Sequence, residues 1–173
     1  EVGRDPNSLT LVCPNDIISL FNWTSKTMNI VTPKRVASLL GGTSKLGREI
    51  KSDRDLEKLV IAGLPSESVK IVVDRIYPDS PHQYYQVVPR STLNRRLSSK
   101  LPLPIQYSEK LERLARIYAF ALYVWESEED TREFMSKKHP MLDNRTPFEA
   151  CMTDLGARQV EQILGRLLFG SAA

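Results

Sequence analysis

Few residues in this chain have the types and spacing that catalysis requires. His82 and His139, its two histidines, each stand beside a proline, with no neighbour to orient the imidazole as a general base needs. Cys151 with His139 could be imagined as nucleophile and base, but packing and loop roles explain both better. The acids Glu128 and Glu129 suit the first turn of a helix, where negative charge complements the helix dipole. We therefore expect no enzyme activity and no catalytic residue.

Phosphate and metal binding also lack the residues they need. The segment from Gly42 to Glu49 has the glycine spacing of a phosphate-binding loop, but Arg48 and Glu49 stand where that loop requires Lys and then Ser or Thr. We interpret it as a helix stop followed by a turn. Cys13 and Cys151, the two cysteines, lie far apart without metal-ligand spacing, which predicts free thiols, no metal site and no cofactor.

Length and composition are those of a soluble globular chain. The sequence has 173 residues, 41% hydrophobic and 26% charged, enough for one domain or two small ones. Its longest apolar run, from Ile117 to Trp125, is nine residues, well short of the roughly 20 that cross a bilayer. We expect no membrane span and a cytoplasmic protein.

The charges are unevenly distributed along the chain. Between Ser80 and Ser108 there is no acid, against three arginines and one lysine. Between Glu126 and Asp154 there are eight acids against four basic residues. A basic middle and an acidic C-terminal part suggest two partners of opposite charge.

Cap and stop residues divide the chain into helices and predict an all-α fold. No segment shows the period-two alternation of a strand. In the first part, helices are expected from Pro33 to Gly41, from Asp53 to Ala62, from about Val69 to Ile76, from Pro81 to Pro89 and from Arg90 to Leu97.

The last two of these helices have the layout of a helix-turn-helix, a short helix followed by a tight turn and a short polar helix. Leu93 and Leu97 would face inward. The outward residues combine cations for phosphates with short polar groups for base edges, which predicts a DNA-binding face. Its members are Arg90, Ser91, Thr92, Asn94, Arg95 and Arg96. A solvated helix face is the alternative.

Four helices are expected after the proline-rich link at Leu101–Pro104, which we take as an internal boundary. Ser108 would cap a long helix to Trp125 that is apolar on both sides, as at the centre of a bundle or in an oligomer interface. Ser127 would cap the second of these helices, and Thr146 with Glu149 forms a capping box at the start of the third. Thr153 or Asp154 would start the last, whose predicted buried side is Val160, Ile163, Leu164, Leu167 and Leu168.

An ordered set of motifs from about Pro33 to Gly170 resembles the Xre/MbcA/ParS antitoxins of type II toxin-antitoxin pairs. The motifs are Leu39–Gly42 with Leu46–Arg48, Asp55-Leu56 to Gly63–Pro65, Pro89–Leu93 with Arg95-Arg96, Glu112–Arg116, Asn144–Glu149, Leu155–Arg158 and Leu164–Arg166. Each motif alone is common, and their order is what resembles the family.

Residues 1–31 show no sustained helical or alternating pattern, so we expect a flexible arm there. The resemblance implies two parts after this arm. Residues 32–104 would be an Xre-like helix-turn-helix domain that binds operator DNA, and residues 105–173 a toxin-binding domain. The implied toxin is of the RES family, which degrades NAD, and the antitoxin's C-terminal end would cover the toxin's NAD pocket. The residues implied in toxin binding are Arg145, Thr146, Pro147, Gly165, Arg166, Phe169, Gly170 and Ser171. A homodimer is also expected, because DNA half-sites and the apolar long helix favour one.

A different class of function fits the same sequence. The chain could be a stand-alone helix-turn-helix transcriptional regulator whose C-terminal domain serves only dimerisation. A toxin gene beside this one, or its absence, separates the two hypotheses.

Overall fold

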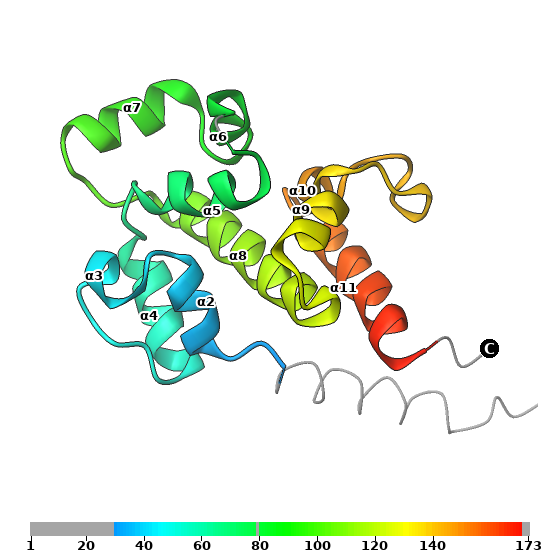
Figure 1. The fold of residues 1–173 in the computed structure, drawn as a ribbon. Helices are drawn as coiled ribbons and strands as arrows, with labels where there is room; N and C mark the ends of the chain where they lie inside the picture. Colours follow the sequence, from blue (N-terminus) through cyan, green and yellow to red (C-terminus); the bar gives the residue numbers. More distant parts are fainter. Residues whose placement is uncertain (1–29, 79, 171–173) are drawn as a thin grey trace, which may run out of the picture.

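The computed structural model describes residues 30–78 and 80–170, and over these residues the chain forms helices and no strand (Figure 1). The predicted all-α fold is confirmed for this part of the chain. The predicted arm at residues 1–31 lies outside the described residues except for Ile30 and Val31, and Ser171 and Cys13 lie outside them as well.

The N-terminal part of the described chain contains α2 (Pro33–Leu39), α3 (Gly42–Leu46), α4 (Asp53–Ala62) and α5 (Ser68–Ile76). The Thr32 hydroxyl caps α2 by accepting from the Arg35 backbone N–H at 3.3 Å, as predicted. The five-residue helix α3 stands where we expected a turn. It begins after Gly41 (φ +115°) and ends at Gly47 (φ +68°), two backbone conformations that glycine adopts readily.

The predicted pair of short helices is confirmed as α6 (Pro81–Val87) and α7 (Arg90–Ser98). Only Val88 and Pro89 separate them. The Tyr84 hydroxyl donates a hydrogen bond to the Asp74 carboxylate and ties α6 to α5. Figure 1 shows both helices at the upper left, above α5.

The long helix α8 runs from Ile105 to Trp125 through the centre of the molecule. It packs against α2, α4 and α5 from the first part of the chain and against α9 and α11 from the last, so its position at the centre of a bundle is confirmed. Its predicted cap is wrong. The helix begins after Pro104, whose φ of −56° already suits a helix start, and the buried Ser108 hydroxyl instead accepts from the Leu64 N–H at 2.9 Å.

The C-terminal part contains α9 (Glu128–Ser136), the short 3₁₀ helix η1 (Pro140–Leu142), α10 (Pro147–Ala150) and α11 (Asp154–Phe169). The predicted caps at Ser127 and Thr153 are confirmed, with the Asp130 N–H 3.2 Å and the Gly156 N–H 3.1 Å from the capping oxygens. The capping box of Thr146 and Glu149 is also confirmed.

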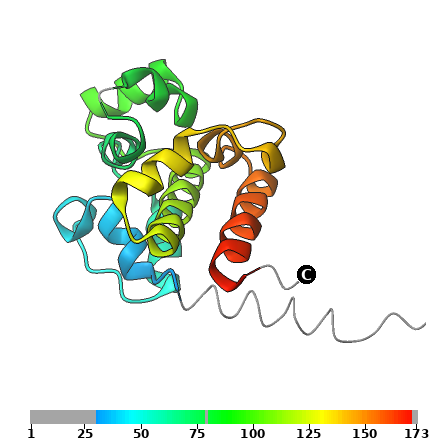
Figure 2. The same cartoon turned by 45° about the vertical axis from the view of Figure 1, so that its right-hand side comes forward.

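Buried residues on both sides of the link at Leu101–Pro104 form one hydrophobic core. The link itself is irregular, as predicted, and is anchored where the Leu103 N–H donates to the Leu64 carbonyl at 2.8 Å. Figure 2 shows α8 between the first helices and α11, with α9 in front. The core therefore fixes α11 relative to α8. The functional boundary predicted near residue 104 stays a prediction.

Candidate functional site

The end of α11 presents apolar and cationic side chains to solvent. Arg166 is exposed, and Phe169 and Leu167 are 42% and 52% exposed. Gly165 is buried within the helix, and Gly170 (φ +71°) ends it. Leu167 was predicted to be buried, and that prediction is wrong. α8 and α11 run in parallel, so the end of α8 at Trp125 lies beside Leu167, and α8 has no further turn to cover it.

The loop before α10 is fixed to α11 by Arg145. The Arg145 Nε donates to the Leu142 carbonyl at 3.1 Å, and its Nη2 lies 3.4 Å from the Gln159 Oε1 on α11. Thr146 and Pro147 are buried and form the start of α10, so their contribution to a surface is indirect. Of the three loop residues that we predicted in a binding site, Arg145 alone has a substantially accessible side chain.

A hollow of about 330 Å³ lies between the end of α8, α9, the segment that follows α9 and the end of α11. Trp125, Phe134, His139 and Leu167 contribute to its lining. The Phe134 ring packs against the rings of Trp125 and His139, with centroid distances of 6.1 and 6.4 Å. The end of α11 borders this hollow through Leu167, whereas Arg145, Thr146 and Pro147 are not among its lining residues. Sequence reasoning missed Trp125, Phe134, His139 and Leu167 as parts of a site, because they come from four separate elements and share no motif.

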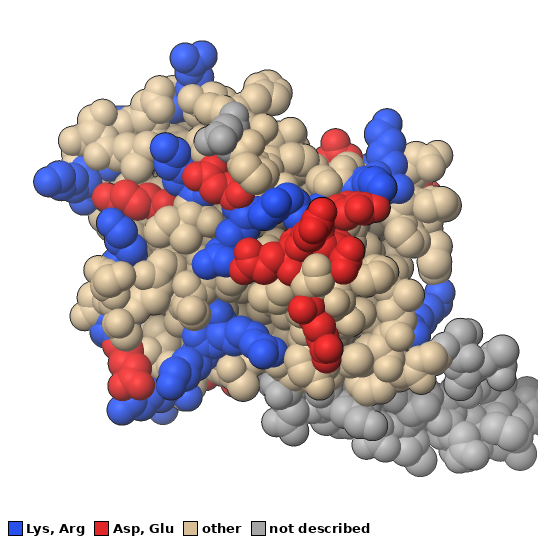
Figure 3. Space-filling model, in the orientation of Figure 1, with Lys and Arg blue, Asp and Glu red and all other residues tan. Residues whose placement is uncertain are grey.

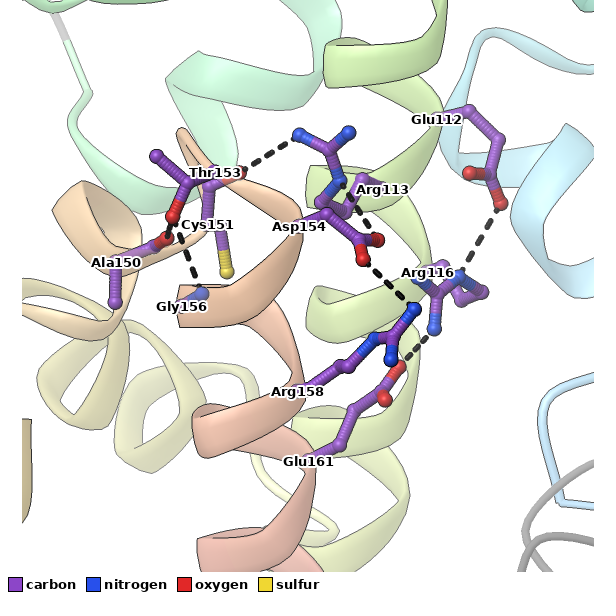
Figure 4. A network of polar contacts seen from close by, with 10 residues as sticks. All are labelled: Glu112, Arg113, Arg116, Ala150, Cys151, Thr153, Asp154, Gly156, Arg158 and Glu161. Atoms are coloured by element: carbon purple, nitrogen blue, oxygen red, sulfur yellow. Dashed lines mark hydrogen bonds and ion pairs between the residues drawn. The ribbon is translucent and has the colours of Figure 1, made fainter.

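Ion pairs hold α8 and α11 side by side (Figure 4). Arg113 donates to the Cys151 carbonyl at 3.4 Å and lies 4.0 Å from the Asp154 carboxylate. Arg116, which follows Arg113 on α8, pairs with Glu161, which lies further along α11 than Asp154. The motif residues Glu112–Arg116 therefore orient α11 on α8.

Gly156 lets α10 approach the start of α11. A Cβ atom at this position would lie 2.1 Å from the Ala150 carbonyl oxygen and 2.9 Å from the Thr153 Oγ1. Figure 4 shows the Gly156 nitrogen facing these atoms. The glycine in the Leu155–Arg158 motif is therefore a packing requirement and not a binding feature.

Two titratable groups beside this network have shifted pKa values because of burial. Desolvation raises the pKa of the Glu112 carboxyl, although Arg116, at 3.5 Å, and Arg113 favour its charged form. Burial raises the pKa of the Cys151 thiol to about 12. Cys151 is a free, buried thiol, as predicted, and its environment disfavours the thiolate that a nucleophile would need.

Helix α7 divides the predicted DNA-binding residues between exposed and half-buried positions. Ser91, Asn94 and Arg95 are exposed, and so is Arg90, whose guanidinium lies 5.5 Å from the centre of the Tyr85 ring. Thr92 and Arg96 are half-buried.

The inner face of α7 differs from its prediction. Leu93 is buried as expected, but Leu97 is 39% exposed, because it lies at the mouth of a cavity and not against the core. Asn94 borders the same cavity, which places it beside α5 as well as on the polar face. On the face shown in Figure 3, the cationic side chains over α6 and α7 stand apart from one another, whereas acidic side chains gather over α9.

The described residues form neither a metal-binding cluster nor a membrane-spanning helix. Within residues 30–78 and 80–170, no group of three or more His, Cys, Asp and Glu side chains is arranged to hold a metal ion. No described helix is both long and apolar enough to span a bilayer.

Comparison with known proteins finds similarity to antitoxins over part of the chain. Residues 120–170, from the last turns of α8 to the end of α11, match the Antitoxin Xre/MbcA/ParS C-terminal toxin-binding domain. A curated relative, "Antitoxin Xre" from Pseudomonas putida, is 30% identical over 91 residues, which cover 53% of this chain. The match spans 57% of the length of that relative. The resemblance predicted from the sequence motifs is confirmed.

Proposed function

We propose that this chain is an antitoxin that binds and neutralises a RES-type, NAD-degrading toxin. The observation that supports the proposal is the exposed end of α11, which lies within the segment that matches a toxin-binding domain. In this proposal the residues from Gly165 onward cover the entrance to the toxin's NAD pocket. Arg166 and Phe169 provide the side chains for that contact, and the hollow beside Leu167 receives part of the toxin surface.

Charge favours the same orientation. Glu128, Glu129 and Asp130 form the first turn of α9, and acidic side chains gather over this helix in Figure 3. A pocket that binds the two phosphates of NAD needs cationic groups, and an acidic surface beside the covering helix would steer the antitoxin toward it.

The first test is NAD consumption by the protein encoded beside this gene, with and without an equimolar amount of this chain. Inhibition by the full chain, and its loss on deletion of residues 166–173, is the expected result. The point variant Arg166→Ala/Phe169→Ala should also lose inhibition while keeping its helical circular dichroism. Leu155→Ser is the matched control, because Leu155 is 74% exposed at the opposite end of α11. Full inhibition by the truncated chain would refute pocket covering.

We further propose that residues 32–104 bind operator DNA through α7, with residues 105–173 as the toxin-binding part. The exposed Ser91 and Arg95 on a helix that follows α6 after two residues support this assignment. A homodimer would place two such helices on two half-sites, and light scattering at micromolar concentration tests for it. If the neighbouring protein does not consume NAD, the stand-alone regulator, dimerised by its C-terminal part, becomes the preferred hypothesis.

A further inference from the structure

A cavity of about 410 Å³ lies between α5 and the α6–α7 pair. Its walls are mainly apolar, with Val69 and Ile71 from α5 opposite Leu93 and Leu97 from α7 and with Tyr85 from α6. This volume falls within the range of roughly 300–1,000 Å³ that is typical of small-molecule sites. The cavity is separate from the hollow beside α11, and neither proposed surface explains it.

Ser66 places an unsatisfied hydroxyl group in the wall of this cavity. Its side chain is 2% exposed, and none of the described residues offers its Oγ a hydrogen-bond partner. A buried hydroxyl without a partner is costly, and natural proteins usually satisfy it. A polar group of a bound molecule would supply the missing partner.

The charged groups at the cavity favour an anion. Lys45 and Lys70 contribute to its lining, and neither forms an ion pair with a described residue, whereas Glu67 is the one acid among the lining residues. Ser66 lies two residues before α5, Lys70 lies in the first turn of this helix, and both line the cavity, so one bound molecule can contact both side chains.

We propose that this cavity binds a small amphipathic carboxylate. Its apolar body lies between Val69 and Leu93, and its carboxylate accepts a hydrogen bond from the Ser66 hydroxyl and pairs with Lys70. Because the apolar walls come from α5 and α7, an occupied cavity holds α7 against α5. The inference rests on the cavity alone and does not depend on the antitoxin proposal.

Octanoate is the probe that tests the proposal, with octylamine as a control of the same chain length and opposite charge. Isothermal titration calorimetry should give a dissociation constant on the order of 0.1–1 mM for octanoate, as expected for about ten heavy atoms. Methyl NMR signals of Val69 and Leu93 should shift, and those of Leu164 in the core beside α11 should not. Octylamine should bind about tenfold more weakly or not at all.

Variants separate a binding role from a structural one. Lys70→Met should weaken octanoate binding several-fold, whereas Lys58→Met, on the exposed face of α4 away from the cavity lining, should not. Ser66→Ala should weaken binding but leave the ligand-free melting temperature unchanged or raised, because it removes an unpaired buried hydroxyl. The proposal is wrong if octanoate causes no shift at about 10 mM, if octylamine binds equally well, or if the two lysine variants behave alike.

Discussion

Replacement of Gly156 by alanine should destabilise the protein, although alanine is the better helix former. The new Cβ would lie 2.1 Å from the Ala150 carbonyl oxygen and 2.9 Å from its carbonyl carbon, and 3.4 Å is where ordinary contact begins. Both atoms belong to the backbone, so no side-chain rotation can relieve the overlap. The α10–α11 junction would have to open by more than 1 Å.

The gain in helix propensity and the cost of overpacking can be compared in magnitude. Gly to Ala within a helix gains about 1 kcal/mol at most, and less at a position in the first turn. Forcing an extra carbon into a packed junction costs about 1–3 kcal/mol and occasionally more. Backbone atoms cannot yield as side chains do, which places the cost at the upper end, so we expect a net loss of about 2 kcal/mol in the free energy of unfolding.

Urea unfolding followed by circular dichroism measures this change. Leu155→Ala is the control, because its side chain is 74% exposed in the same turn of α11 and should change stability by less than about 0.5 kcal/mol. Because the junction orients α11, the proposed function predicts that the Gly156 variant also inhibits the toxin less well than the control does. Equal stability of the Gly156→Ala variant and the original chain would refute the packing argument.

The arginines of α7, the thiol of Cys151 and the hydroxyl of Ser108 each have a measurable role. Arg95→Ala with Arg96→Ala should weaken operator binding and reduce the magnitude of the slope of log K against log salt by up to about two. Fluorescence anisotropy at several salt concentrations measures this slope, and an unchanged slope would mean that α7 does not contact DNA phosphates. Cys151 has a pKa of about 12, so the thiolate fraction at about pH 8 is on the order of 10⁻⁴, and a thiol reagent should modify Cys151 only after unfolding. Ser108→Ala should cost about 1–3 kcal/mol in urea unfolding, because it leaves the buried Leu64 N–H without its acceptor.

The helix boundaries could be predicted because caps act locally. Thr32, Ser127 and Thr153 each accept from a backbone N–H three residues later, so the sequence around them already contains both partners. Ser108 has the right residue type for a cap, yet its hydroxyl accepts from Leu64, 44 residues away in sequence. A local rule cannot find such a contact.

Burial at the helix ends could not be predicted for a related reason. Leu167 continues the apolar spacing of Ile163 and Leu164, but whether it is covered depends on where α8 ends. Leu97 continues the spacing of Leu93 and lies at the mouth of a cavity. Periodicity identifies the face of a helix, and the neighbouring helices decide how far along that face the core extends. Both exceptions lie where the candidate binding surfaces begin.

The shared core predicts that the two parts proposed to bind DNA and toxin do not fold independently. α8 belongs to the C-terminal part by the predicted boundary, but it packs against α2, α4 and α5 as well as against α9 and α11. A fragment of residues 105–173 would expose the side of α8 that the first helices cover, including the Ser108 hydroxyl that accepts a hydrogen bond from the Leu64 N–H.

We therefore expect the full chain to unfold in one cooperative transition, with circular dichroism and Trp125 fluorescence giving coincident urea curves. Because Trp23 also emits, a Trp23→Phe variant isolates the Trp125 signal. The fragment should bind a hydrophobic dye and aggregate where the full chain does not. Two separated transitions, or a fragment with a sharp transition of its own, would mean that the contacts across α8 contribute little to the free energy of unfolding. In that case a toxin bound at α11 could not influence α7 through the core. With one transition, ligands at either end stabilise the same folded unit.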